Sequence, residues 1–213
     1  NSGTKGRKAL AAVFMMREGL PFLYQGQEIG MVNSRWEDIG EINDINTLDQ
    51  YRLAKEQGFS EARALQMGED FSRDNARTPM QWSSRENAGF SKAKPWLKVN
   101  PDYRETNVEN EERDPDSVLW FYKKLIRIRK DEKYAETLVY APMEPVYQDR
   151  DNVIGFYRRG DATILVLANM QDREVRLASP GRIQEILANT DKELQREGDN
   201  IVLHPFQALV AEL

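Results

Sequence analysis

The stretch SRDNARTPMQWSS gathers side chains suited to gripping a polar ligand. Arg73 and Arg77 lie four positions apart and bracket Asp74, while Trp82 and, further along, Trp96 offer flat apolar faces. A guanidinium donates hydrogen bonds in one plane, so it can fix a carboxylate or hold two hydroxyl groups at once. These residues would therefore suit a site for a polyhydroxylated ring. They would equally suit a long loop tied to its domain through carboxylates, and the chemistry alone leaves both interpretations open.

Few other residues could carry acid–base or nucleophilic chemistry. His204 is the single histidine, which excludes a histidine metal cluster, and no Gly-x-Ser-x-Gly turn is present. Because His204 precedes a proline in a strand-like segment, we expect it to pack or cap. Glu28 directly follows a predicted buried strand, the place where α/β barrels carry their chemistry. No second carboxylate is identifiable near it, so we favour a buried Glu28 that accepts hydrogen bonds from backbone amides.

The composition limits the class of protein. The 213 residues are 40% hydrophobic and 31% charged, enough for a sizeable core under a well-solvated surface. The net charge is -5 and no basic tract stands out, so nucleic acid is not an expected partner. Cysteine is absent, which excludes disulfides and thiolate catalysis and is compatible with the cytoplasmic location that we expect.

Neither a membrane segment nor a signal peptide is indicated. No apolar run approaches the roughly 20 residues that span a bilayer, and the start lacks an apolar stretch followed by a cleavage site. We therefore expect no membrane partner.

The front of the chain predicts an α/β arrangement that would position these side chains. Residues 6–18 show helical spacing, and the apolar run PFLYQ at residues 21–25, bounded by proline and glycine, predicts a short buried strand. Further helices are expected over residues 46–57, 60–68 and 117–130, with an ordered loop over residues 72–110. The helix over 117–130 has an apolar stripe and a basic end that complements the helix dipole.

The back of the chain predicts an all-β arrangement. From residue 137 short apolar or alternating pieces are separated by turn residues, as in a β-sandwich. The expected strands are TLVYA, NVIGFYRR, ATILVLANM, REVRLA, RIQEIL, NIVLH and QALVAEL. We therefore expect an α+β chain that divides into residues 1–132 and residues 133–213.

An ordered set of motifs resembles one enzyme family. GLPFLYQGQEIGM is followed about forty residues later by SRDNARTPMQW, and then by AGF, PWLKVNPDY and SVLWFYKKLIRIRK. This set resembles the α-glucosidases of glycoside hydrolase family 13 (the α-amylase superfamily), above all the oligo-1,6-glucosidase and dextran glucosidase (glucan 1,6-α-glucosidase) group. Trehalose-6-phosphate hydrolases and sucrose isomerases are near neighbours. The resemblance covers essentially the whole chain.

The resemblance implies that the chain is a C-terminal fragment. Residues 1–132 would supply the last part of a catalytic (β/α)8 barrel: its seventh helix, eighth strand, a long excursion and eighth helix. Residues 133–213 would form the C-terminal antiparallel β-sandwich. The three catalytic carboxylates would all lie upstream, since the family's Asn-His-Asp motif is missing, so the fragment would be inactive. An isolated barrel strand exposes both edges, so residues 21–26 would self-associate or rearrange.

The resemblance also assigns roles in substrate binding. Arg73 would bind the non-reducing glucosyl unit together with an aspartate from the missing part, supported by Asp74, Arg77 and Trp82. Asn46 stands where relatives often have a carboxylate that helps bind the leaving sugar, which leaves that specificity open.

The activity implied for the whole enzyme is retaining, exo-acting hydrolysis of α-1,6-glucosidic bonds through a covalent glucosyl intermediate. Its partners would be an oligosaccharide substrate and the rest of the barrel in cis. We expect no cofactor and no metal, because the spacing of a calcium loop is absent.

The sequence is also compatible with other functions. The chain could act on α-1,4 bonds or trehalose 6-phosphate, or be a non-catalytic scaffold like the heavy subunits of amino-acid transporters. The retained SRDNARTPMQW favours an enzyme over a scaffold. The β-rich part could instead bind carbohydrate through an aromatic platform, although aromatics at strand spacing are more often core. These aromatics are Tyr134, Tyr140, Tyr147, Phe156, Tyr157 and Phe206.

Overall fold

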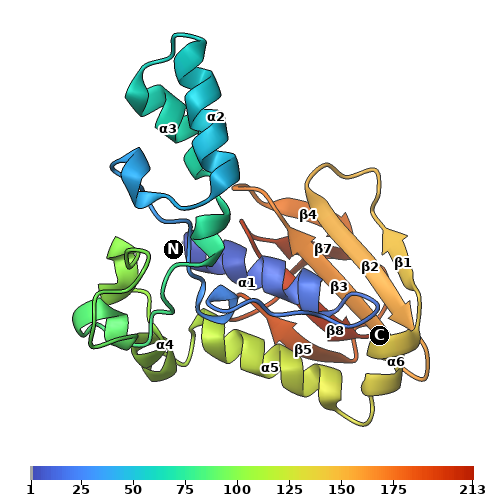
Figure 1. Cartoon of the computed structure of the whole chain (residues 1–213). Helices are drawn as coiled ribbons and strands as arrows, with labels where there is room; N and C mark the ends of the chain where they lie inside the picture. The colour runs from blue at the N-terminus through green and yellow to red at the C-terminus, as the bar shows by residue number, and fades with distance from the viewer. Residues whose placement is uncertain (1) are drawn as a thin grey trace. The chain divides into compact units, whose positions relative to one another are not determined.

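The computed structural model describes residues 2–213, which form two compact units (Figure 1). The first unit combines residues up to Leu23 with Asp116–Leu213, and the second is Tyr24–Pro115. In this chain the first helix and residues 116–132 thus belong with the strands. The division predicted at residues 132 and 133 refers to the domains of a longer enzyme and stays a prediction.

Helices cover one face of the first unit. α1 (Ser2–Met15) and α5 (Val118–Lys130) pack against each other, and α1 also contacts the strands β3 and β8 (Figure 1). The buried alanines of α1, among them Ala9 and Ala12, let neighbouring backbones approach closely. α5 begins where the hydroxyl of Ser117 accepts a hydrogen bond from the amide of Trp120 at 3.2 Å. A short helix, α6 (Ala135–Tyr140), follows.

Two antiparallel sheets form the rest of this unit. The larger has the strand order β1-β2-β3-β8-β5 and the smaller the order β4-β7-β6. In chain order the strands are β1 (Met143–Val146), β2 (Val153–Arg159), β3 (Thr163–Asn169), β4 (Val175–Ala178), β5 (Glu185–Asn189), β6 (Gln195–Glu197), β7 (Asn200–Leu203) and β8 (Ala208–Glu212). The predicted change from helices to antiparallel strands is confirmed.

Strand β3 joins two hydrophobic cores because its side chains alternate between the faces of the sheet. Ile164 and Val166 pack with the helices, whereas Leu165 and Leu167 pack with the smaller sheet. All four side chains are fully buried. This explains why the sequence of β3 is a continuous apolar run rather than an alternating one.

Two buried arginines bind the backbone where α1 ends. Arg129 donates to the carbonyls of Met15 (2.8 Å), Arg17 (3.0 Å) and Gly19. Arg158 donates to the carbonyl of Met16 (2.6 Å), and it also reaches the carbonyls of Thr137 and Ala141. A helix leaves its last carbonyls without partners and negatively polarised, so a cation satisfies them well. Burial lowers the pKa of both guanidiniums.

The second unit is built from short helices and ordered loops. α2 (Ile45–Glu56) packs against α3 (Glu61–Glu69), and the hydroxyl of Ser60 caps α3 by accepting from the amide of Arg63 at 3.3 Å. The remainder consists of η1 (Gln27–Ile29), η2 (Ile39–Glu41), η3 (Arg73–Ala76), η4 (Glu86–Gly89), η5 (Pro101–Arg104) and α4 (Val108–Arg113). A small core of Trp36, Ile42 and Leu97 holds these loops.

The strand predicted at residues 21–25 is wrong for this structure. These residues form no strand, and Leu20, Phe22 and Tyr24 are more than half exposed. The amide of Gln27 donates to the carbonyl of Tyr24 at 3.0 Å, which closes a turn instead. A strand needs a neighbour to accept its backbone hydrogen bonds, and none of the described strands pairs with this segment. Self-association through residues 21–26 stays a prediction.

The strand predicted at residues 137–141 is also wrong, since Thr137 and Leu138 belong to helix α6. A short apolar run does not separate strand from helix by its pattern alone. Here the amide of Leu138 donates to the carbonyl of Tyr134 at 2.8 Å, and the side chain of Leu138 is fully buried. Strands β1 and β6 were not predicted, because MEPV contains a proline and QRE is entirely polar.

The aromatic side chains of the β-rich part differ in exposure, and two of them are not available to a ligand. Tyr134 and Phe156 are buried, as expected of core residues, while Tyr140 is 71% exposed on α6. Tyr147, Tyr157 and Phe206 are half-buried. None of the helices that the structure describes has the length and apolar character needed to cross a bilayer.

We expect Arg158→Met to destabilise the protein by about 3–5 kcal/mol, because several buried carbonyls would lose their donor. The matched control is Arg159→Met, one position along the same strand. Arg159 is about half exposed, pairs with Glu144 and stacks on Tyr157, so its loss should cost about 1 kcal/mol or less. Urea unfolding of the two variants measures the difference. Equal costs would contradict a structural role for the buried guanidinium.

Candidate functional site

Arg73 is held by a buried carboxylate, that of Asp44. Its Nε donates to Oδ1 of Asp44 at 2.7 Å, and its backbone amide donates to Oδ2 at 3.2 Å. Its Nη2 lies 2.6 Å from Oδ1 in the ion pair with the same carboxylate. The Asp44 side chain is fully buried, whereas the Arg73 side chain is 63% exposed. No hydrogen bond within residues 2–213 engages Nη1 of Arg73. The guanidinium is therefore fixed along one edge and leaves donors for a ligand on the other.

Asp74 anchors the backbone that carries Asp44. Its Oδ2 accepts hydrogen bonds from the amides of Asn43 (2.6 Å) and Asp44 (2.9 Å), and its Oδ1 accepts from Nη1 of Arg77 (3.0 Å). Asp74 has no exposed surface. Asp74 and Arg77 are thus joined to the segment that carries Asp44, the partner of Arg73. Their predicted role as supports of a sugar-binding Arg73 stays a prediction.

The environment of Asp44 keeps its carboxylate ionised. Burial by itself would raise the pKa of Asp44, but hydrogen bonds from Arg73 and Thr47 and the charge of Arg73 outweigh burial and lower that pKa to about 2. The hydroxyl of Thr47 donates to Oδ2 at 3.0 Å. The carboxylate therefore stays charged at neutral pH and holds the guanidinium in place.

The other predicted site residues are not joined to this pair by hydrogen bonds. The Trp82 side chain is 51% exposed, and it makes neither a hydrogen bond nor a cation–π contact with Arg73. Asn46 is exposed in the first turn of α2, with a side chain that has no hydrogen-bond partner in the described chain. The roles predicted for Trp82 and Asn46 stay predictions.

Glu28 lies in η1, and the hydrogen bonds expected for it are missing at one oxygen. Oε2 of Glu28 is buried and has no hydrogen-bond partner among residues 2–213. The expectation that nearby backbone amides satisfy this carboxylate is therefore wrong for Oε2.

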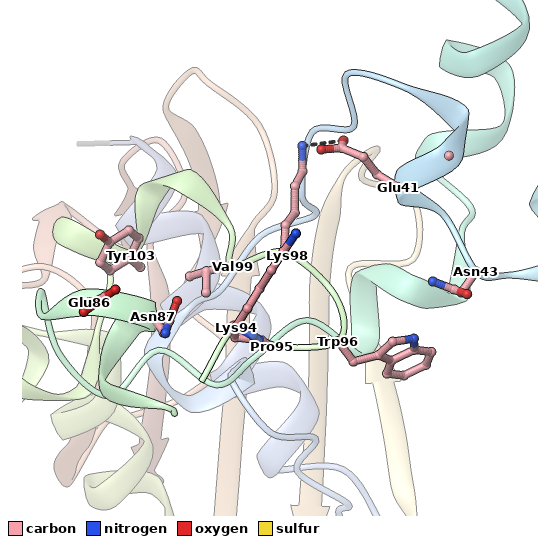
Figure 2. Close-up of a pocket in the computed structure, with 11 residues that line it drawn as sticks. Glu41, Asn43, Glu86, Asn87, Lys94, Pro95, Trp96, Lys98, Val99 and Tyr103 are labelled. Atoms are coloured by element: carbon pink, nitrogen blue, oxygen red, sulfur yellow. Dashed lines mark hydrogen bonds and ion pairs between the residues drawn. The ribbon is translucent and has the colours of Figure 1, made fainter. Parts of the chain in front are cut away.

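Trp96 lines a cavity of about 510 Å³ within the second unit. The lining comes from three loop segments, residues 40–43, 86–87 and 94–103, and includes amide, carboxylate and ammonium groups (Figure 2). Trp96 as a residue is 70% exposed. Asn43, which directly precedes Asp44, contributes to the wall of this cavity.

His204 contacts two polar side chains beside the smaller sheet. Its ring nitrogens lie 3.0 Å from Oδ2 of Asp191 and 2.8 Å from Oε1 of Gln195, just after strand β7. These contacts join the residue after β7 to the start of β6 and to the loop that precedes β6. Across the part of the chain that the structure describes, no group of three acidic or histidine side chains could hold a metal ion.

Asp44 is the partner of Arg73 that the sequence did not reveal. An aspartate just before a helical pattern is ordinarily a helix cap. Asp44 does occupy the cap position of α2, but its side chain caps no backbone amide of that helix. It binds Arg73 instead, 29 residues further along the chain.

Comparisons of the whole chain with known proteins show which family it is similar to. Residues 2–139 match the catalytic domain of alpha-amylase. The chain is 37% identical to an oligo-1,6-glucosidase of Bacillus cereus, in an alignment covering 97% of this chain and 38% of that protein. It is 38% identical to a glucan 1,6-alpha-glucosidase of Streptococcus pneumoniae, covering 98% and 38%. The chain thus spans less than two-fifths of the length of these relatives.

A second activity occurs among the similar proteins. A trehalose-6-phosphate hydrolase of Bacillus subtilis is 35% identical over 98% of this chain. The crystal structure of the Bacillus licheniformis trehalose-6-phosphate hydrolase has a TM-score of 0.90 at 33% identity, covering 99% of this chain and 39% of that one. An isomaltulose synthase from Klebsiella sp. LX3 has a TM-score of 0.87 at 33% identity, covering 98% and 38%.

We expect Asp44→Asn to destabilise the protein in a pH-dependent way. The folded pKa of Asp44 is lower than its ordinary 3.8, so its stabilisation is present above pH 3.8 and is lost as the pH falls towards about 2. The difference in free energy of unfolding between the wild type and Asp44→Asn should be about 2 kcal/mol at neutral pH and shrink across that window.

Urea unfolding at stepwise lower pH measures this difference. The control is Asp49→Asn, because Asp49 pairs with Arg52 on the surface of α2 and both side chains are more than half exposed. A difference for Asp44→Asn that stays constant with pH would refute the charged pair.

Proposed function

The chain belongs to the alpha-amylase family, glycoside hydrolase family 13, and from that premise we propose that it is part of an exo-acting, retaining α-glucosidase. Its substrates would be α-1,6-glucosidic bonds at the non-reducing end of isomalto-oligosaccharides or dextran. The observation that carries this proposal is the guanidinium of Arg73, which Asp44 fixes from the buried side while 63% of the side chain stays exposed.

In the proposed site Arg73 donates hydrogen bonds to hydroxyl groups of the terminal glucosyl unit. Two of its nitrogens are committed to Asp44, and Nη1 is the donor left for the sugar. A donor whose orientation is fixed before binding loses little conformational entropy when the substrate arrives. A cation held at the end of a pocket would accept a chain end rather than the middle of a glucan, which accounts for the exo action in the proposal.

The bond cleavage itself we assign to carboxylates outside these 213 residues. One carboxylate would attack the anomeric carbon, a second would protonate the leaving oxygen, and water would then release glucose with retained configuration. This reaction uses no cofactor. The remainder of the barrel in cis and the oligosaccharide are the partners that the proposal requires, and the cytoplasm is the location it assumes.

The second candidate is a hydrolase of trehalose 6-phosphate or of α-1,4 bonds. It is favoured by the similar trehalose-6-phosphate hydrolases and by Asn46, an uncharged residue at the position proposed to contact the leaving sugar. Initial rates on isomaltose, maltose and trehalose 6-phosphate discriminate between the candidates. A kcat/KM highest for isomaltose supports the first proposal, and one highest for another substrate replaces it.

In the full-length protein that carries this chain, we expect Arg73→Ala to lower kcat/KM for isomaltose by about 100-fold or more. The control is Arg35→Ala, because Arg35 is likewise an exposed arginine bound to a shielded carboxylate, that of Glu69, at 2.9 Å. Its turnover should stay within about twofold, since no sugar contact is assigned to it. Near-normal turnover of Arg73→Ala, with an unchanged fold by circular dichroism, removes Arg73 from the site.

The 213-residue chain by itself should release no glucose from isomaltose or from p-nitrophenyl α-glucoside, because the proposal puts all reacting carboxylates elsewhere. Glucose release is followed with a coupled assay against a mock-purified sample. Turnover above that sample would show that the reacting groups lie within these residues and would overturn this part of the proposal.

A further inference from the structure

The cavity beside Asn43 has the size and composition of a small-molecule site. Its volume of about 510 Å³ lies within the range of roughly 300–1,000 Å³ typical of ligand pockets. All of its lining residues belong to the second unit. The roles given above to Arg73 and Asp44 do not use this cavity.

The charges around the cavity balance each other. Lys98 donates to Oε2 of Glu41 at 2.8 Å, the ion pair drawn as a dashed line in Figure 2, and its ammonium lies 5.5 Å from the ring of Trp36. Lys94 and Glu86 add one further charge of each sign. A lining with two cations and two anions favours a neutral polar ligand over a phosphate, which would require an excess of positive charge.

An exposed indole provides a flat apolar surface at this cavity. Trp96 keeps 70% of its surface accessible, although residues on both sides of it, Pro95 and Leu97, are partly or fully buried. Neighbouring residues thus fix the backbone while the ring stays uncovered. A rigid aromatic face of this kind contributes large contact area at low entropic cost when a ligand ring stacks on it.

Two amide side chains add hydrogen-bonding groups. Within the described residues the side chain of Asn43 has no partner, so both its donor and its acceptor are available. The amide nitrogen of Asn87 donates to the carbonyls of Ser91 (3.1 Å) and Ala93 (3.2 Å), which fixes the group and leaves its oxygen as an acceptor. One amide of fixed orientation and one with both groups available, together with an aromatic face in the same lining, suit the alternating hydroxyl and C–H groups of a sugar ring.

We propose that this cavity binds one neutral glucosyl unit of an α-glucan, which stacks on Trp96 and hydrogen-bonds to the amides of Asn43 and Asn87. The choice of a glucan rests on the proposed function, whereas the neutral, ring-shaped ligand follows from the lining. Asp74 holds the backbone amide of Asn43 as it holds that of Asp44, so one carboxylate positions parts of both sugar sites.

The test is electrophoresis of the full-length protein through native gels that contain increasing concentrations of dextran. Every variant carries Arg73→Ala, which weakens binding of chain ends and leaves the cavity intact. Retardation of this parent by dextran reports the cavity and does not depend on turnover. A separate glucose-release assay on the wild type tests the proposed function, so failure of one proposal is distinguishable from failure of the other.

We expect Trp96→Ala in this background to require about a tenfold higher dextran concentration for the same retardation, and Asn43→Ala to require severalfold more. The matched control is Tyr140→Ala, which removes an aromatic side chain of equal exposure, 71%, outside the cavity lining. Its retardation should equal that of the parent. Isomaltose added to the gel should abolish the retardation, while inorganic phosphate should leave it unchanged.

Three results overturn the proposal. One is a parent that dextran does not retard, and another is a Trp96→Ala variant retarded as strongly as the Tyr140→Ala control. The third is competition by inorganic phosphate but not by isomaltose, which would assign the cavity to an anion. Thermal unfolding of each variant confirms that a lost retardation does not reflect a lost fold.

Discussion

The candidate site depends on one buried carboxylate, that of Asp74. It accepts the backbone amides of Asn43 and Asp44 and the guanidinium of Arg77, and it has no exposed surface of its own. A carboxylate removed from water needs all of its hydrogen bonds, so the two segments that it joins cannot separate cheaply. Asp74 thereby positions Asp44, and Asp44 orients the exposed guanidinium of Arg73. Both carboxylates are buried, so neither is exposed to a ligand.

In the first unit, buried cations rather than a buried carboxylate hold separate backbone segments together. Arg129 and Arg158 are buried cations whose hydrogen bonds all go to backbone carbonyls, most of them in residues 15–19, at and just after the end of α1. The negative end of the helix dipole and the unsatisfied carbonyls supply the compensation that a carboxylate would otherwise supply. Arg129 therefore connects α5 to the end of α1, and Arg158 connects strand β2 of the larger sheet to the same segment.

Local patterns predicted the elements whose partners lie close in sequence. The helix at residues 117–130 has its apolar stripe, its serine cap and its basic end within one segment, and it is confirmed almost to the residue. Most strands of the β-rich part are likewise confirmed. Residues 21–25 show the opposite case, because a strand exists only when a neighbour pairs with it, and no described strand does. The composition of that segment carries no information about its neighbours.

For the candidate site, the sequence by itself determined the family and singled out Arg73, since a motif of this kind is contiguous in the chain. Only the tertiary structure decided that Asp44, 29 residues away, is the partner of Arg73. It also decided that Trp96 and Asn43 line one cavity. The physical reason is that a hydrogen bond is set by distance and direction between groups in space, and neither quantity is written in the spacing of residues along the chain.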